Sequence, residues 1–199
     1  MTATLILASA SPARAGMLAA AGVTIEARPA RVDEASLRDA MAAEGAASRD
    51  IADALAEMKA LRVSARAPGA LVLGADQVLD LDGVRFDKPR DRSEARAQLA
   101  RLRGATHTLV SAAVIARDGA PLWRAVGLAR LTMRPFSDAC LDAYLDAIGD
   151  DVLSTVGGYR IEGLGAQLFA RVEGDHFTIL GLPLLEVLEC LRAQGVLAR

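Results

Sequence analysis

Hydroxyl groups and a guanidinium gather in the short segment Ser9–Arg14, which has the sequence SASPAR. The apolar run Leu5–Ala8 before it is typical of a buried strand, and Ser11 and Pro12 fit the N-cap and first residue of a helix. Free backbone N–H groups and the positive end of a helix make such a junction an anion site. Its two serines and its arginine add donors suited to phosphate. The segment lacks the glycine pattern of a Walker loop, and an ordinary helix cap with a solvated arginine is the alternative.

Acidic residues stand at two places where predicted strands end. Asp33 and Glu34 come a few residues after the predicted short strand Thr24–Ala27, and Asp76 directly follows the very apolar run Ala70–Ala75. A carboxylate at the end of a buried strand needs a partner such as a cation or a metal ion. Strand ends are also where α/β proteins bind ligands. A plain interpretation stays open for each place: a solvated acidic pair at 33–34 and a cap at 76.

Lysine is rare in this chain, which has 21 arginines and only two lysines, Lys59 and Lys88. Lys88 lies in the polar turn Asp87–Arg90. A compact ammonium is not interchangeable with a planar guanidinium. A chain that uses arginine almost everywhere else has a reason to keep lysine where a point charge is required, and retention by chance is the alternative.

A glycine-rich segment spans residues 157–165 and contains four glycines around Glu162. Glycines let the backbone approach a ligand closely, although they also serve an ordinary irregular loop. His107 and His176 lack the spacing of metal ligands, so we expect both to be structural or surface residues. The chain has no nucleophile elbow for a Ser-His-Asp triad. Together the carboxylates, the lysines, the hydroxyl-rich turn and the glycine segment favour phosphate-ester or phosphoanhydride chemistry with Mg²⁺ or Mn²⁺ and without a covalent nucleophile.

The composition narrows the class of protein. The chain has 199 residues, of which 52% are hydrophobic, and this suits one domain or two closely joined lobes with a real core. A formal net charge of −2 without a basic tract argues against nucleic acid and acidic membranes as partners. No uncharged stretch reaches the roughly 18 residues of a membrane span, and we recognise no signal peptide. Cys140 and Cys190 are expected to be buried free thiols, which favours the reducing cytoplasm.

Hydrophobic periodicity and turn signals predict a mixture of hairpins and strand–helix units, and hence an α/β fold with a mixed sheet. Asp-Gly pairs at 82–83 and 118–119 predict two hairpin turns. Helices are expected to start at the caps Ser48, Ser93 and Ser137 and at Pro183. The helix that starts at Ser93 is expected to end at Gly104. Further strands are expected at Val78–Leu81, Val84–Phe86, Thr106–Ala116, Leu122–Met133 and Gln167–Val172.

In their order along the chain, these segments resemble the Maf family of nucleotide pyrophosphatases. The resemblance runs from about Leu5 to the last helix and rests on LILASASPAR, VDE at 32–34, Lys59-Ala60, GADQV, DKP, GGYRIEG and GLPL. It implies a single α/β domain, residues 1–199, of two lobes on a long curved mixed sheet flanked by helices, with a central cleft as in Maf and ITPase folds. It also implies a homodimer and Mg²⁺- or Mn²⁺-dependent cleavage of a nucleoside triphosphate to monophosphate and pyrophosphate.

The resemblance also implies roles for individual residues. Ser9 and Arg14, in the same turn as Ser11, match phosphate-binding positions. Asp76 matches the proton acceptor that activates water, and Glu34 or Asp76 would hold the metal ion. The implied catalytic cluster is Glu34, Lys59, Asp76 and Lys88.

Three positions separate substrate branches of the family, and here they are Ala13, Gln77 and Glu162. Gln77 and Glu162 resemble the branch that acts on 7-methyl-guanosine triphosphate, whereas the dTTP/UTP branch has Thr and Gln there. Ala13 departs from the Trp of the methylguanosine branch. The carboxylate of Glu162 can accept hydrogen bonds from the paired N–H donors of guanine. Methylation at N7 adds a positive charge to the base, and a nearby carboxylate attracts that charge. The alternatives are a pyrophosphatase of the dTTP/UTP type and a non-catalytic nucleotide-binding regulator of cell division.

Overall fold

A computed structural model describes residues 4–198, and the chain divides into two compact units. The first unit contains residues up to 77 together with 110–128 and those from 175 onward. The second contains 78–109 and 129–174. Since the chain passes between the units several times, each unit is assembled from segments that are distant in sequence.

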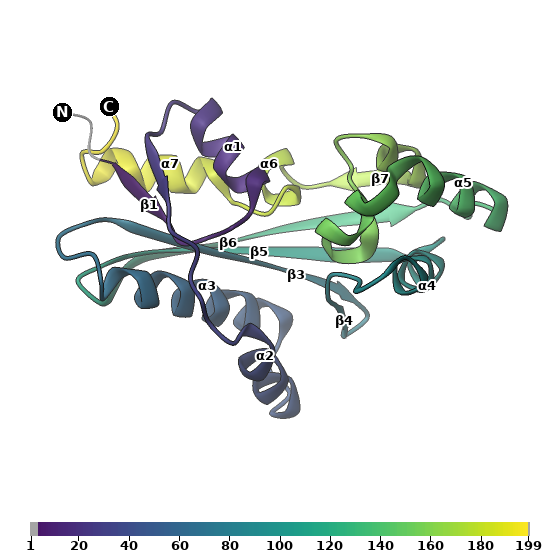
Figure 1. The fold of residues 1–199 in the computed structure, drawn as a ribbon, viewed down its shortest axis with the longest axis horizontal. Coiled ribbons are helices and arrows are strands. Elements are labelled where there is room, and N and C mark those ends of the chain that lie inside the picture. The colour runs from purple at the N-terminus through teal and green to yellow at the C-terminus, as the bar shows by residue number, and fades with distance from the viewer. Residues whose placement is uncertain (1–3, 199) are drawn as a thin grey trace. The chain divides into compact units, whose positions relative to one another are not determined.

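The strands form one mixed sheet in the order β2-β1-β3-β5-β6-β7, with β4 paired to β3 (Figure 1). β1 pairs in parallel with both β2 and β3, whereas the β3–β4 and β6–β7 pairs are antiparallel. This arrangement confirms the predicted mixed α/β sheet. The strands span Leu5–Leu7 (β1), Ile25–Ala27 (β2), Val72–Leu81 (β3), Val84–Phe86 (β4), Thr106–Arg117 (β5), Ala120–Met133 (β6) and Phe169–Glu173 (β7).

Helices cover both faces of the sheet in the first unit. α1 (Pro12–Ala20) and α7 (Leu184–Ala193) lie on one face and α3 (Ser48–Ser64) on the other (Figure 1). The side chains of β1 alternate between these layers: Leu5 and Leu7 join the core with α1 and α7, whereas Ile6 packs in the cluster that includes Val63 of α3. The short α6 (His176–Ile179) precedes α7.

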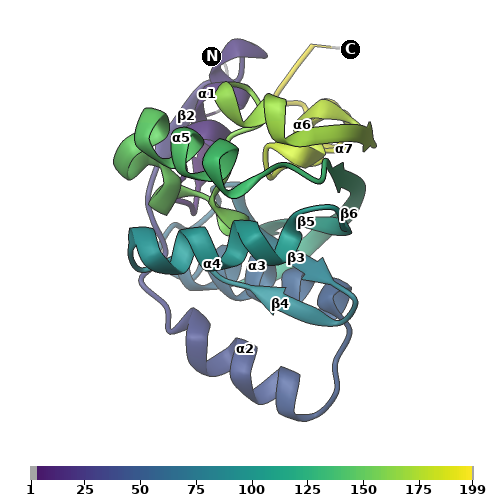
Figure 2. The ribbon, with the colours of Figure 1, turned by 90° about the vertical axis from the view of Figure 1, so that its right-hand side faces the viewer.

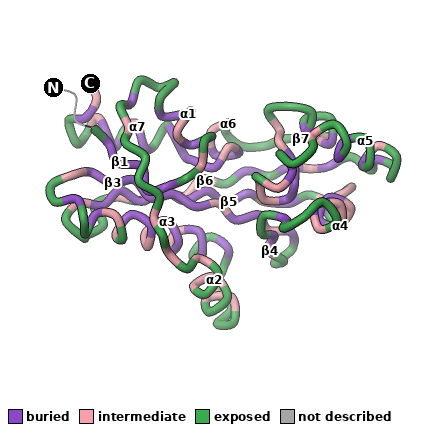
Figure 3. The backbone as a smooth tube through the Cα atoms, in the orientation of Figure 1, coloured by how far each residue is buried: buried purple, intermediate pink, exposed green. Residues whose placement is uncertain are grey.

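One helix of the first unit, α2 (Glu34–Ala43), was not predicted from the sequence. It has no buried residue, and Figure 3 shows its tube in the colours of exposed and intermediate positions. In Figure 2 the helix lies apart from the sheet with α3 between them. Its two large apolar residues, Leu37 and Met41, are only partly buried, so the helix contributes no side chain to the core. Asp33 caps it by accepting a hydrogen bond from the Ser36 backbone N–H at 3.0 Å.

The second unit combines the remaining strand segments with helices and irregular turns. α4 (Arg92–Leu102) and α5 (Asp138–Ile148) carry complementary charges, including the Arg96–Asp142 ion pair at 2.7 Å. Three 3₁₀ helices follow α5: η1 (Gly149–Ser154), η2 (Val156–Gly158) and η3 (Leu164–Leu168).

Most of the predicted turns and helix starts are confirmed. Both Asp-Gly pairs have positive φ at both positions, with φ of 51° at Asp82 and at Asp118. Ser137 caps α5 through the Cys140 backbone N–H, Pro183 precedes α7, and α4 ends just before Gly104.

Two predicted caps are wrong. Ser48 is the first residue of α3, with Ala47 at the N-cap, and Asp91 rather than Ser93 caps α4 by accepting from the Glu94 N–H. At both starts a residue one or two positions earlier has the extended backbone of an N-cap, a difference that composition alone does not reveal.

The two cysteines are free thiols, but only Cys190 is buried, and Cys140 is partly exposed, contrary to the prediction. Among residues 4–198 no helix combines the length and the apolar character that crossing a bilayer requires.

Candidate active site

The turn between β1 and α1 has the predicted strand–turn–helix form. Ser11 has an extended backbone at the N-cap of α1, and Pro12 occupies the first helical turn. The Ser11 hydroxyl accepts a hydrogen bond from the Arg14 backbone N–H at 3.4 Å, and Ser9 Oγ accepts one from the Ser11 N–H at 3.2 Å. The hydroxyls therefore fold the turn upon itself at the positive end of the helix.

Arg14 is buried and is held by protein oxygens rather than by solvent. Its Nη1 donates to Ser9 Oγ at 3.1 Å and to the Ala75 carbonyl at 3.0 Å, and its Nε donates to the Gly181 carbonyl at 2.8 Å. Burial lowers the pKa of the Arg14 guanidinium, while the nearby carboxylates of Asp76 and Glu34 oppose that shift. Because a guanidinium stays protonated in proteins, this side chain is a fixed positive charge beside the turn.

Lys59 joins the two predicted acidic sites into one cluster. Its Nζ lies 2.6 Å from Asp76 Oδ1 and 2.7 Å from Glu34 Oε2. The side chains of Lys59 and Asp76 are each 8% exposed, whereas that of Glu34 is 37% exposed. The second carboxylate oxygen of Asp76 is buried and accepts no hydrogen bond from the described residues. A buried carboxylate oxygen without a partner is costly, so this atom is an acceptor prepared for a water molecule, a proton or a cation.

Close packing of α3 on β3 positions Lys59 against Asp76. Gly74 on β3 faces Ala56 and Ala60 of α3, and a Cβ at position 74 would lie 2.6 Å from the Ala60 nitrogen and closer still to the Ala56 carbonyl. Only glycine permits this approach. The buried face of α3 accordingly carries the small residues Ala52, Ala56 and Ala60 beside Ile51 and Leu55. Met58 and Leu61 lie on its partly exposed side.

The predicted strand end at Asp76 is wrong, because β3 continues through Asp76 and Gln77 to Leu81 as one strand. Gln77 follows Asp76 and fastens α6 to the middle of β3. Its Nε2 lies within hydrogen-bond distance of Ser111 Oγ at 3.0 Å, of the Ile179 carbonyl at 3.0 Å and of the Thr178 carbonyl at 3.2 Å. Ser111 Oγ donates to the same Thr178 carbonyl at 2.7 Å. The amide nitrogen is thus occupied by protein acceptors, and Oε1 accepts no hydrogen bond from the described residues.

Gly181, Ser111 and Thr178 contribute to this site, and the sequence analysis assigned them no role. Gly181 has φ of 102°, and a side chain there would lie 3.4 Å from Arg14 Nη2. Its carbonyl accepts the Arg14 Nε–H. The one sequence signal was the GLPL segment that begins at Gly181. Ala13, one residue before Arg14, is exposed on the first turn of α1.

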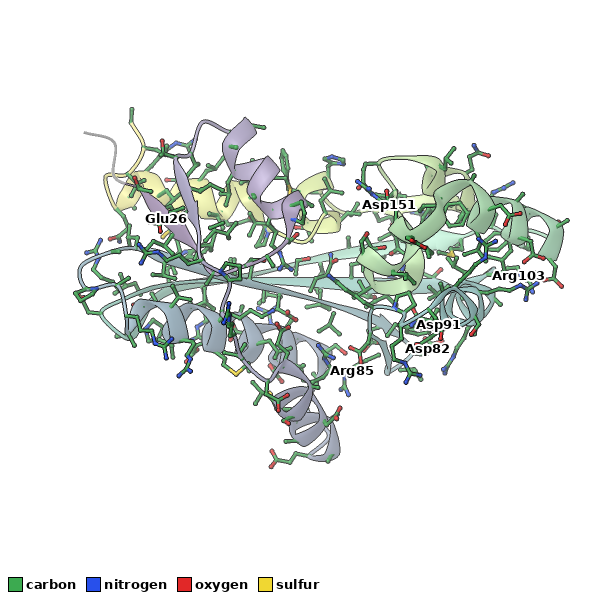
Figure 4. The ribbon with its side chains drawn as sticks, viewed as in Figure 1. Glu26, Asp82, Arg85, Asp91, Arg103 and Asp151 are labelled. Atoms are coloured by element: carbon green, nitrogen blue, oxygen red, sulfur yellow. The ribbon has the colours of Figure 1, made fainter. Side chains whose placement is uncertain are left out.

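Lys88 and Glu162 belong to the second unit, so they are described with their own neighbours. Lys88 is exposed and follows β4, immediately before the buried Pro89. Glu162 accepts a hydrogen bond from Arg160 Nε at 3.0 Å. Arg160 also pairs with Asp151, which Figure 4 labels on η1. The Glu162 carboxylate is therefore half of an exposed ion pair in this structure.

The histidines have structural or surface positions, as predicted. His107 is buried, and its Nε2 lies 2.7 Å from the Tyr159 hydroxyl in a cluster with Phe169. Burial lowers the pKa of His107 to about 4, so its ring is neutral at pH 7. His176 is exposed at the start of α6. Within residues 4–198 no group of three or more His, Cys, Asp or Glu side chains could hold a metal ion by itself.

These features define an α/β protein with a buried arginine and an acid–lysine–acid cluster beside a strand–turn–helix anion site. The chain belongs to the family described as Maf-like protein, whose model matches residues 4–194. It is 56% identical over 194 residues to "Nucleoside triphosphate pyrophosphatase 1" of Jannaschia sp. strain CCS1, covering 98% of each chain. It is also 56% identical to the nucleoside triphosphate pyrophosphatase of Paramagnetospirillum magneticum, covering 96% of this chain and 99% of the relative. The relative of that name from Caulobacter vibrioides is 54% identical over 96% of both chains.

Proposed function

We propose that the protein hydrolyses nucleoside triphosphates between the α and β phosphates and releases a nucleoside monophosphate and pyrophosphate. The names of the relatives support this activity, and family membership of nearly the whole chain supports its transfer. The observation that carries the proposal is the Lys59 ammonium between Asp76 and Glu34, with the second Asp76 oxygen left as a buried acceptor.

The reaction begins when a water oxygen attacks the α-phosphorus. The new bond joins that oxygen to the α-phosphorus, and the bond from the α-phosphorus to the α–β bridging oxygen breaks. The electron pair of the broken bond leaves with pyrophosphate, and the water proton moves to Asp76 Oδ2. Lys59 donates a hydrogen bond of 2.6 Å to Asp76 Oδ1. This contact fixes the carboxylate, so that Oδ2 can act as the general base.

Positive groups offset the negative charge that develops on the triphosphate. Arg14 is fixed by three protein oxygens, so little reorganisation is needed when an anion arrives. The positive end of the α1 dipole lies at the same turn and favours a phosphate there. Lys88 supplies a further cation in this proposal, as the resemblance implies.

The acidic cluster also fits a divalent metal ion. Glu34 is partly exposed, so its carboxylate would hold Mg²⁺ or Mn²⁺ beside Asp76, whose Oδ2 stays free to accept the water proton. Mg²⁺ is usually bound by one or two carboxylates together with substrate phosphates, which suits a chain without a larger group of ligands in residues 4–198. When bound, the ion would polarise the phosphate oxygens and reduce their repulsion of the attacking water.

For the substrate, we propose 7-methyl-guanosine triphosphate first, with dTTP or UTP as the alternative. Gln77 and Glu162 match the methylguanosine branch. The Gln77 amide nitrogen is occupied by Ser111 and α6, so this residue offers the base only an acceptor. To bind the base, the Glu162 carboxylate would have to break its ion pair with Arg160 and accept hydrogen bonds from the edge of the base instead. The free-energy cost is modest because exposed ion pairs are weak.

The test is hydrolysis of a triphosphate panel in ¹⁸O-labelled water with Mg²⁺ or Mn²⁺. Attack at the α-phosphorus places the label in the monophosphate, with one pyrophosphate per turnover. Diphosphate and orthophosphate as primary products, or label in pyrophosphate, would contradict the proposal. The variant D76N, which lacks the proposed general base, should lose this hydrolysis. Its matched control is D39N, because Asp39 is an exposed acid of α2 outside the cluster.

A further inference from the structure

Four arginines line a small cavity in the first unit. Arg28 and Arg31 come from the segment between β2 and α2, Arg62 from the last turn of α3, and Arg66 from the turn that follows. The cavity has a volume of about 290 Å³, and its remaining lining residues are Pro29, Ala30 and Val63. Neither Asp76 nor Lys59 lines it.

The positive charge of this cavity is mostly unbalanced. Arg28 pairs with Glu26, at 2.5 Å and 2.9 Å between its two nitrogens and the carboxylate oxygens, and Figure 4 labels Glu26 on β2. Arg31, Arg62 and Arg66 form no ion pair with any residue in 4–198. The negative end of the α3 dipole favours cations at that helix end, but it does not explain the arginines that the β2–α2 segment brings to the same cavity.

The floor of the cavity is apolar and anchored to the core. Ala30 and Val63 pack against the buried cluster that contains Ile6, Ala8 and Val72. A fixed floor holds both sides of the rim at a set separation, so the guanidinium groups are presented to one small ligand rather than spread over a flexible surface.

We propose that this cavity is an anion site for a diphosphate group, separate from the catalytic cluster. Guanidinium groups have the planar fork that binds phosphate oxygens in pairs. Ligand pockets for drug-sized molecules begin at about 300 Å³, so the volume suits two phosphates without an accompanying base. The diphosphate is either free pyrophosphate or the terminal phosphates of a nucleotide whose base stays outside.

A bound diphosphate would connect the two segments that carry the catalytic cations and acids. Arg31 precedes Glu34 by three residues, and Arg62 follows Lys59 by three. A ligand held by both arginines therefore ties the segment that leads into Glu34 to the helix that carries Lys59. Binding of the product, pyrophosphate, at this site would therefore stabilise the Lys59–Glu34 ion pair.

The test is calorimetric titration of the full chain with inorganic pyrophosphate, a measurement with no catalytic step and hence independent of the proposed function. R62Q/R66Q removes two charges from the rim, and R49Q/R130Q removes two exposed charges elsewhere. We expect the first variant to lose a class of sites, or to bind there at least about tenfold more weakly, since charge-assisted hydrogen bonds contribute that much or more. We expect the control to bind like wild type.

Hydrogen exchange locates the ligand. Pyrophosphate should protect the backbone amides of Ala30 and Arg31 in wild type and in the control, but not in R62Q/R66Q. Unchanged binding and protection in R62Q/R66Q, or equal loss in both variants, would overturn the proposal. Should R62Q/R66Q unfold, A30E replaces it by placing a carboxylate in the cavity, and pyrophosphate binding that survives A30E overturns the proposal as well.

A second titration distinguishes the two sources of the diphosphate. Its ligand is a nucleoside triphosphate with a methylene group in place of the α–β bridging oxygen. Tighter binding of this analogue than of pyrophosphate at the rim-dependent site assigns it to nucleotide phosphates, and equal or weaker binding assigns it to free pyrophosphate.

Discussion

Replacing Gly74 by alanine tests whether the contact between β3 and α3 sets the geometry of the catalytic cluster. The new Cβ would lie 2.6 Å from the Ala60 nitrogen and closer still to the Ala56 carbonyl oxygen, and ordinary contact begins at 3.4 Å, so α3 must retreat by more than about 0.8 Å. If α3 moves directly away, the bond of 2.6 Å between Lys59 and Asp76 lengthens to more than about 3.4 Å, beyond the normal range of a hydrogen bond.

The expected effects of G74A follow from that displacement. Overpacking of a core commonly costs about 1–3 kcal/mol of stability, and misplacement of catalytic groups by about 1 Å can cost 10²-fold in rate. We therefore expect kcat for triphosphate hydrolysis to fall by about two orders of magnitude while the protein stays folded at 25 °C.

The assay is pyrophosphate release together with urea unfolding, and the control is G16A. Gly16 lies within α1 and has open space around its Cβ position, so alanine there should stabilise the protein by up to about 1 kcal/mol without changing kcat. Wild-type kcat and stability in G74A would refute the argument that this close approach positions Lys59.

The remaining predictions concern single side chains. D76N should lower kcat by 10²-fold or more and keep affinity for an uncleavable triphosphate analogue, because it removes the base and preserves shape; a loss of less than about tenfold would exclude Asp76 as the general base. K88R should reduce kcat strongly, whereas R101K should not, since the guanidinium is bulkier and planar; equal rates for K88R and wild type would remove that argument. Since His107 has a pKa of about 4 when folded against 6.5 in the unfolded chain, unfolding takes up a proton between those values. Stability should then fall by about 3 kcal/mol as the pH drops through this window, and urea unfolding of H107Q should lack this component. E162Q should lower kcat/KM for 7-methyl-GTP relative to GTP, UTP, CTP and dTTP; a wild type that prefers dTTP or UTP, with no shift in the variant, would contradict the proposed role of Glu162.

Local chemistry made much of this protein predictable from its sequence. The Ser11–Pro12 helix start, the Asp-Gly turn at 118–119 and the helix after Ser137 each depend on residues a few positions apart. Such signals act through one turn of backbone and survive in most tertiary contexts. The rarity of lysine likewise singled out Lys59 before its partners were known.

Where local signals were weak or shared between neighbours, the sequence misled. Helix α2 has no buried residue, and Asp33 acts as its cap while Glu34 turns to Lys59. Ala47, next to Ser48, and Asp91, two residues before Ser93, took the cap positions instead.

The amino-acid sequence by itself determined which chemical groups are available: an acid in a very apolar segment, a retained lysine, and a hydroxyl-rich turn with an arginine. Only the tertiary structure decided which of them meet. Lys59 reaches Asp76 across 17 positions because Gly74 lets the backbone of α3 come close, and Arg14 reaches the Gly181 carbonyl across 167. Contacts at such separations depend on how closely sheet and helices pack, a property of the assembled core that no short segment carries.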